Sequence, residues 1–151
     1  MRPTDAIGTG ANPIRPDAGT DRAEFRKRIE LIEESYEFML GYAAQGVAGD
    51  REARSGEQLR DYLERSDAAL ADLAGAFTSL VEREKLEPPE QHHAFASVLE
   101  RDARDSRAAI RLVLAQPSIS SQLIDNLNAS IHLRALLTDL FLIDEILKLK
   151  A

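Results

Sequence analysis

Apolar residues recur at alternating steps of four and three through most of this chain, and that spacing constrains the fold more than any other feature. In residues 21–45 the spaced positions are Phe25, Ile29, Ile32, Tyr36, Met39 and Ala43. Residues at these steps share one face of an α-helix. No stretch alternates with a period of two, so no β-sheet is expected.

The spacing continues in residues 55–86, which we predict to be one amphipathic helix. Its apolar face comprises Leu59, Leu63, Ser66, Leu70, Leu73, Phe77 and Leu80. Ser55 is a suitable N-cap, and Gln58 follows three residues later, as in a capping box. Pro88 and Pro89 follow the helix and separate it from the next segment.

A third helix is predicted from Pro89 to Gln116. Proline is tolerated at the first helical position because the N–H that it lacks would have no partner there. Pro117 ends the helix, since the residue before a proline is disfavoured in helical geometry. The inner face is Phe95, Leu99, Ala103, Ser106, Ile110, Val113 and Leu114.

The fourth segment begins at Ser118 or Ser120, and its apolar pattern changes direction halfway. Its first stripe is Ile119, Leu123, Leu127 and Ile131, and its second is Leu133, Leu136, Leu140, Ile143, Ile146 and Leu147. At helical geometry the two stripes lie about 150° apart. We expect either a kink near Ser130–Leu133 or a helix that uses two faces.

Four helices with short connections predict an all-α, antiparallel up-down-up-down four-helix bundle. We assign residues 21–151 to this single domain. Residues 1–20 hold three of the six prolines, which predicts a flexible N-terminal arm. An alternative role for the arm is a docking peptide, with residues 11–16 extended.

Composition excludes several functional classes. The chain has no cysteine, which rules out disulfides, thiol catalysis and cysteine–zinc sites. Its net charge of −7, from 26 acidic and 19 basic groups, argues against a nucleic-acid partner. We find no long apolar run and no signal peptide, so we expect no membrane partner and a cytoplasmic location.

Apolar residues beside the main stripes predict an interface between two copies of the chain. The first helix has a second apolar set at steps of seven and four, which makes its apolar arc wide, and the last helix has apolar residues outside its inner stripe. Exposed apolar stripes usually find a partner. The predicted interaction face is Leu31, Phe38, Tyr42, Phe141, Leu142 and Leu149.

Arg104, Arg107 and Arg111 form a basic stripe on the third predicted helix, at steps that bring their side chains together. One interpretation pairs them with acids such as Glu100 or with the acidic face of the first helix. The other makes them a docking patch for an acidic partner, or a small-anion site.

A polar pocket between helices is the other candidate site. Its members would be Tyr36, His92, Asp102, Ser106 and His132. For a metal ion, the sequence holds one Glu-x-x-His pair, Glu90 and His93, in the first turn of a helix, whereas a di-iron bundle needs two such pairs. We therefore predict no metal and no cofactor.

These observations favour a non-catalytic helical protein that acts through protein–protein contact, as an adaptor, chaperone or scaffold, and associates into a homodimer. No nucleophile motif or phosphate-binding loop is present. The alternative is a ligand-binding or regulatory bundle that uses the polar pocket. A second alternative is a metal-dependent bundle enzyme.

Overall fold

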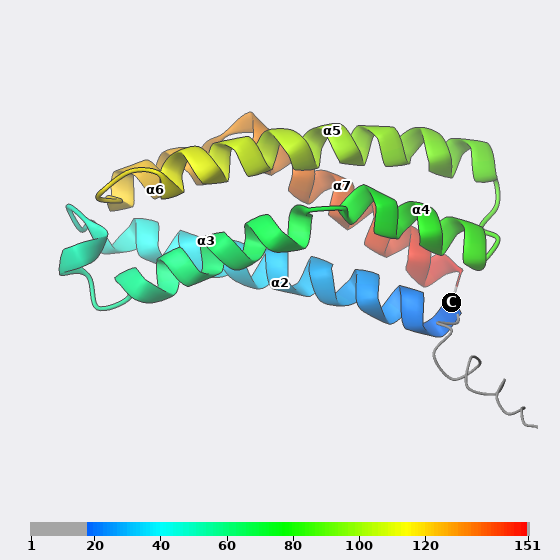
Figure 1. Ribbon diagram of the computed structural model, residues 1–151, viewed down its shortest axis with the longest axis horizontal. Coiled ribbons are helices and arrows are strands. Elements are labelled where there is room, and N and C mark those ends of the chain that lie inside the picture. Colours follow the sequence, from blue (N-terminus) through cyan, green and yellow to red (C-terminus); the bar gives the residue numbers. More distant parts are fainter. Residues whose placement is uncertain (1–17, 151) are drawn as a thin grey trace, which may run out of the picture.

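The computed structural model describes residues 18–150 and is built from helices (Figure 1). The elements are α2 (Ala18–Gln45), the 3-10 turn η1 (Asp50–Glu52), α3 (Gly56–Leu70), α4 (Leu73–Arg83), α5 (Pro89–Leu114), α6 (Ser121–Ala129) and α7 (Ile131–Leu149). Residues 18–150 contain no β-strand, which confirms the all-α prediction. No helix in this range is long and apolar enough to cross a membrane. Of the predicted arm, residues 1–17 lie outside the description, as does the proposed docking peptide, and residues 18–20 belong to α2.

The helices lie side by side along one long axis and enclose a core of aliphatic side chains (Figure 1). α2 packs against α3 and α4 and also against α6, while α5 packs against α3, α4 and α7. Phe25, Leu63, Leu99 and Leu140, from four different helices, are fully buried. The predicted inner faces of the first three segments are buried or partly buried throughout, as expected from their spacing.

The segment 55–86 is two helices, which corrects the expectation of one. Ala71 has an extended backbone and Asp72 lies in the left-handed region at φ 60°, so α3 and α4 are separate. A guanidinium nitrogen of Arg28, on α2, donates to the carbonyl oxygens of Ala69 and Ala71 at 3.0 and 2.8 Å. These bonds satisfy carbonyls that a broken helix leaves without partners.

The last segment breaks at Ser130, which decides between the two expectations in favour of a kink. Ser130 is extended at φ −64° and ψ 146°, and its hydroxyl accepts a hydrogen bond from the Leu133 N–H at 3.3 Å. Ser120 caps α6 in the same way, through the Leu123 N–H at 3.0 Å. Ile131 continues the first predicted stripe in sequence, but it is exposed because the break resets the phase of the helix.

A polar network connects two turns at one end of the molecule. The Asp50 carboxylate accepts from Arg60 Nε at 2.7 Å and from the Ile119 N–H at 2.6 Å. Arg60 also donates to the carbonyls of Leu114 and Gln116 at 3.1 and 2.9 Å. The bond from Arg60 lowers the pKa of Asp50 and, with the Ile119 N–H, outweighs the opposing effect of burial. The carboxylate is therefore held in its charged form between the turns.

Candidate functional site

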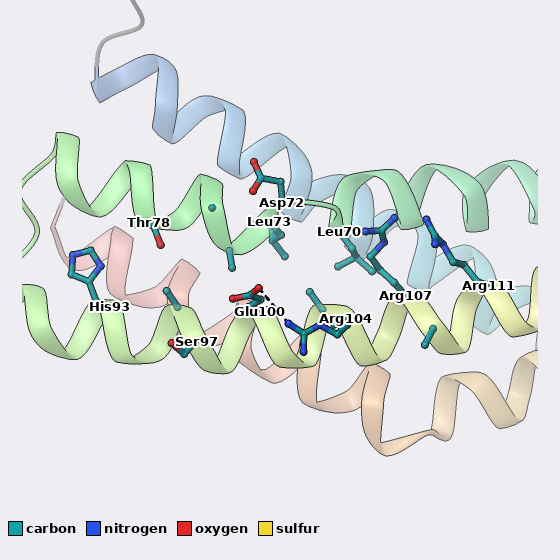
Figure 2. Close-up of a pocket in the computed structure, with 15 residues that line it drawn as sticks. Leu70, Asp72, Leu73, Thr78, His93, Ser97, Glu100, Arg104, Arg107 and Arg111 are labelled. Atoms are coloured by element: carbon teal, nitrogen blue, oxygen red, sulfur yellow. Dashed lines mark hydrogen bonds and ion pairs between the residues drawn. The ribbon is translucent and has the colours of Figure 1, made fainter.

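The arginine stripe lies along a groove between α4 and α5, shown in Figure 2. The groove has a volume of about 830 Å³. Arg104, Arg107 and Arg111 line it from α5, as their spacing predicted, and His93 and Thr78 lie at the far end. This hollow is larger than the two beside α7 that are described below, so it is the first place to look for a ligand.

The arginines of this groove have acidic partners within the molecule. Arg107 Nε donates to Asp67 Oδ1 at 2.8 Å, and Arg111 Nε lies 3.1 Å from Asp67 Oδ2. Burial raises the pKa of Asp67, but the bonds from both arginines outweigh it and keep that pKa below its usual value. Arg104 contacts Glu100 at 3.4 Å. The expected pairing with Glu100 is therefore confirmed for Arg104. The other two arginines pair with Asp67 on α3, which the sequence did not indicate.

A second candidate surface is the solvent-facing side of α7, which we call the α7 outer face. It consists of Ile131, Arg134, Thr138, Phe141, Leu142, Glu145 and Leu149, all of them exposed. Its four apolar members are 50–80% exposed. Side chains of this size are normally buried, so their gathering on one helix marks a candidate contact surface.

An apolar hollow of about 240 Å³ lies beside the α7 outer face, between α5 and α7. Its lining is Phe77, Gln91, His92, Phe95, Leu142, Ile143, Ile146 and Leu147. His92 Nδ1 lies 2.7 Å from the Pro88 carbonyl oxygen, and its ring stacks near Phe77 with the ring centroids 6.3 Å apart. His92 therefore helps to form an apolar wall.

Two carboxyl groups meet between α5 and α7. Asp139 is 6% exposed and lies against Asp102. Burial, and then the hydrogen bond and charge of Asp102, raise the pKa of Asp139 to about 8. No N–H or O–H donor within residues 18–150 reaches Asp139 Oδ2. With this raised pKa Asp139 is mostly protonated at neutral pH, and its proton can complete the hydrogen bond with Asp102.

The residues predicted to form a polar pocket lie in separate environments. Ser106 is buried and donates to the backbone carbonyl of His132 at 3.0 Å, while the His132 side chain is exposed. Asp102 faces Asp139, His92 lines the apolar hollow, and Tyr36 packs against the core from α2. The structure joins α5 to α7 at Ser106 and Asp102 but does not gather all five side chains around one cavity.

The predicted interaction face is likewise divided. Phe38 packs on Tyr62 of α3, with the ring centroids 4.8 Å apart, and Leu31 is partly buried against the core. Tyr42 is buried, and its hydroxyl donates to the Ile119 carbonyl at 2.7 Å. These three residues therefore belong to internal packing, because α3 and the turn before α6 cover them. Phe141, Leu142 and Leu149 lie on the α7 outer face instead.

Glu90 and His93, the weak metal candidates, are exposed in the first turns of α5. Within residues 18–150, no three His, Asp or Glu side chains are grouped closely enough to hold a metal ion.

Sequence reasoning did not single out Asp67, Asp139 or the polar residues of the α7 outer face as site residues. A signal for Asp139 was present, since this acid lies between Leu136 and Leu140 on the apolar side of α7.

No protein-family model matches the chain, and comparisons with curated proteins and with solved structures find no match.

Proposed function

We propose that this chain is an antiparallel up-down-up-down four-helix bundle that acts through protein–protein contact, without catalysis, and associates with a second copy of itself through the α7 outer face. One observation carries the proposal. Of the seven large apolar side chains exposed among the described residues, five lie on α7. They are Ile131, Phe141, Leu142, Ile146 and Leu149. Exposed apolar side chains gathered on one helix are typical of interaction sites.

Leaving these apolar side chains in water costs free energy that a contact would recover. Fully burying one Leu, Ile or Phe side chain contributes about 1.5–3 kcal/mol. Phe141 is 57% exposed and Leu149 is 80% exposed, so much of this gain is unused in the isolated chain. The apolar hollow beside Leu142 and Ile146 extends the same surface toward Phe95 of α5. A partner that covers both would bury a continuous apolar strip.

Light scattering coupled to size exclusion tests this proposal directly. We expect the chain, of mass 16.7 kDa, to run at twice that mass at micromolar concentration. Phe141→Glu should shift it to the monomer mass, because a carboxylate buried in an apolar contact has no partner. Leu112→Glu is the matched control, since Leu112 is 68% exposed but lies on α5. A wild-type monomer that Phe141→Glu leaves unchanged would exclude self-association.

A second candidate function, binding of an acidic ligand or peptide, is favoured by the three arginines that line the α4–α5 groove from one helix. Arg107 and Arg111 both bond Asp67 through Nε, so their terminal N–H groups can donate to an anionic ligand. Thermal-shift titration with inorganic phosphate and with a glutamate-rich peptide tests it, since a ligand of the native state raises its stability. The variant Arg104→Ala/Arg111→Ala should lose the shift, whereas Arg65→Ala on α3 should retain it.

A further inference from the structure

From either end, the α7 outer face presents residues in the same order: an apolar residue, then a charged residue, then the centre. The charged residue is a cation at one end and an anion at the other. Ile131 and Leu149 are apolar at its two ends. Inside them lie one cation, Arg134, and one anion, Glu145. The centre is Thr138, Phe141 and Leu142. At 100° per residue these positions occupy an arc of about 100°, so one partner can contact all of them.

Such an order matches a two-fold antiparallel pairing of α7 with a second copy of itself. In this arrangement a residue of one copy faces the residue of the second copy whose number, added to its own, gives a fixed sum. For the pairing proposed here that sum is about 280. Ile131 then faces Leu149 of the second copy, and Thr138 faces Leu142 of the second copy. Arg134 lies opposite Glu145 of the second copy, and the symmetry repeats each contact.

The charges of the outer face select this direction over a parallel one. No ion pair of the Arg134 side chain is found in residues 18–150, and the nearest cation to Glu145 is Lys148 at a loose 3.8 Å. Both side chains are exposed and can pair with a second chain. A parallel pairing would place Arg134 against its own copy and Glu145 against its own copy, which is repulsive.

The shape of the α7 outer face is consistent with the same antiparallel register. The N-terminal half of α7 is hollowed, with a shallow depression of about 450 Å³ lined by Ile131, Arg134, Ala135, Thr138 and Asp139. In the C-terminal half, Leu142 and Leu149 are 50% and 80% exposed. The antiparallel register places these exposed leucines of one copy over the depression of the other.

We propose that α7 pairs antiparallel with α7 of a second copy, about a two-fold axis near Leu140, with two reciprocal Arg134–Glu145 ion pairs. This inference rests on the self-association proposed above, and it adds the direction, the register and the residues that select the partner.

Charge reversal of the full-length chain tests the register. Arg134→Glu alone places two carboxylates opposite each other at each pair, and Glu145→Arg alone places two guanidinium groups there. Each single variant should dimerise about tenfold more weakly, or worse. An equimolar mixture of the two variants should recover the affinity as a heterodimer. In the heterodimer one pair joins the two introduced side chains and the other joins the two natural ones, so opposite charges meet at both. Sedimentation velocity with one variant fluorescently labelled measures this recovery.

Matched charge changes away from α7 provide the control. Arg101→Glu on α5 and Glu64→Arg on α3 are exposed and should leave the dimer unchanged. Circular dichroism confirms that each variant is folded. A dimeric wild type whose two α7 variants fail to associate when mixed would overturn the pairing while leaving the proposed function in place. A wild type that is monomeric at about 0.1 mM would remove both.

Cysteine cross-linking gives an independent measurement, since the natural chain has no cysteine. Thr138→Cys mixed with Leu142→Cys should form the mixed disulfide in excess over either homodisulfide. A parallel pairing would reverse this preference, because it brings each cysteine against its own copy.

Discussion

Asp139→Asn is expected to remove a pH dependence from the stability of this protein. In the native state the Asp139 carboxyl has a pKa of about 8, against 3.8 for the ordinary group. The folded chain therefore holds a proton that the unfolded chain releases across this range. Because the native state binds more protons, the free energy of unfolding falls as pH rises from about 4 to about 8.

The size of the effect follows from the two pKa values. Each pH unit inside the window removes about 1.4 kcal/mol from the free energy of unfolding. Between about pH 5 and about pH 8 the wild type should lose on the order of 4 kcal/mol from this one group. The introduced amide resembles the protonated acid, since its nitrogen can donate to Asp102. The variant and the wild type should be close in stability at about pH 5 and should diverge above it.

Urea unfolding followed by circular dichroism, repeated across this pH range, measures the difference between variant and wild type. Asp105→Asn, an exposed change on the same helix as Asp102, is the control and should give a difference that does not vary with pH. Asp102→Asn should lower the pH at which the dependence ends without removing the dependence, because burial contributes more than Asp102 to the raised pKa of Asp139. A difference between Asp139→Asn and wild type that stays flat with pH would refute the assignment of a buried, protonated carboxyl.

Four further changes test the packing, each by the midpoint of urea unfolding at neutral pH. Arg60→Ala should cost about 3 kcal/mol, because it leaves the buried Asp50 carboxylate without its cation. Gly56→Ala should destabilise the fold, since a Cβ there would collide with the Asp50 carbonyl oxygen, whereas Gly41→Ala, in open space on α2, should stabilise it by about 0.5–1 kcal/mol. Ser130→Ala should cost about 1 kcal/mol through loss of the α7 N-cap, and an unchanged midpoint would mean that this hydroxyl does not cap the helix.

The apolar spacing predicted the helices and their inner faces because burial of a helical stripe depends on local periodicity. Local periodicity does not predict the break between α3 and α4. The stripe continues from Leu70 to Leu73 at the same step, so the pattern contains no sign of an interruption. The carbonyls freed by the break are satisfied by Arg28, which lies 41 and 43 residues earlier in the chain. A contact at that sequence separation is not visible in local periodicity.

The sequence predicted those features of the candidate surfaces that lie on a single helix, but not the contacts between helices. The arginine stripe lies on one helix, so its spacing located it, but its partner Asp67 comes from another helix. The division of the predicted interaction face has the same origin. Whether Phe38 or Phe141 is exposed depends on which helix covers it, and α3 covers Phe38 through Tyr62.

The break at Ser130 connects the fold to the proposed interface. α6 packs closely on α2, whereas α7 turns away and packs on α5 instead. Near the C-terminal end of α7, long polar side chains span from α2, with Arg22 donating to the Leu147 carbonyl at 2.9 Å and Arg26 pairing with Asp144 at 3.1 Å. Because α7 buries one stripe against α5 and meets α2 through polar bridges, its remaining apolar residues, Phe141 among them, stay in solvent. A straight last helix would have continued the α6 stripe inward at Ile131, so the change of neighbour at Ser130 accounts for the apolar surface that a second copy is proposed to cover.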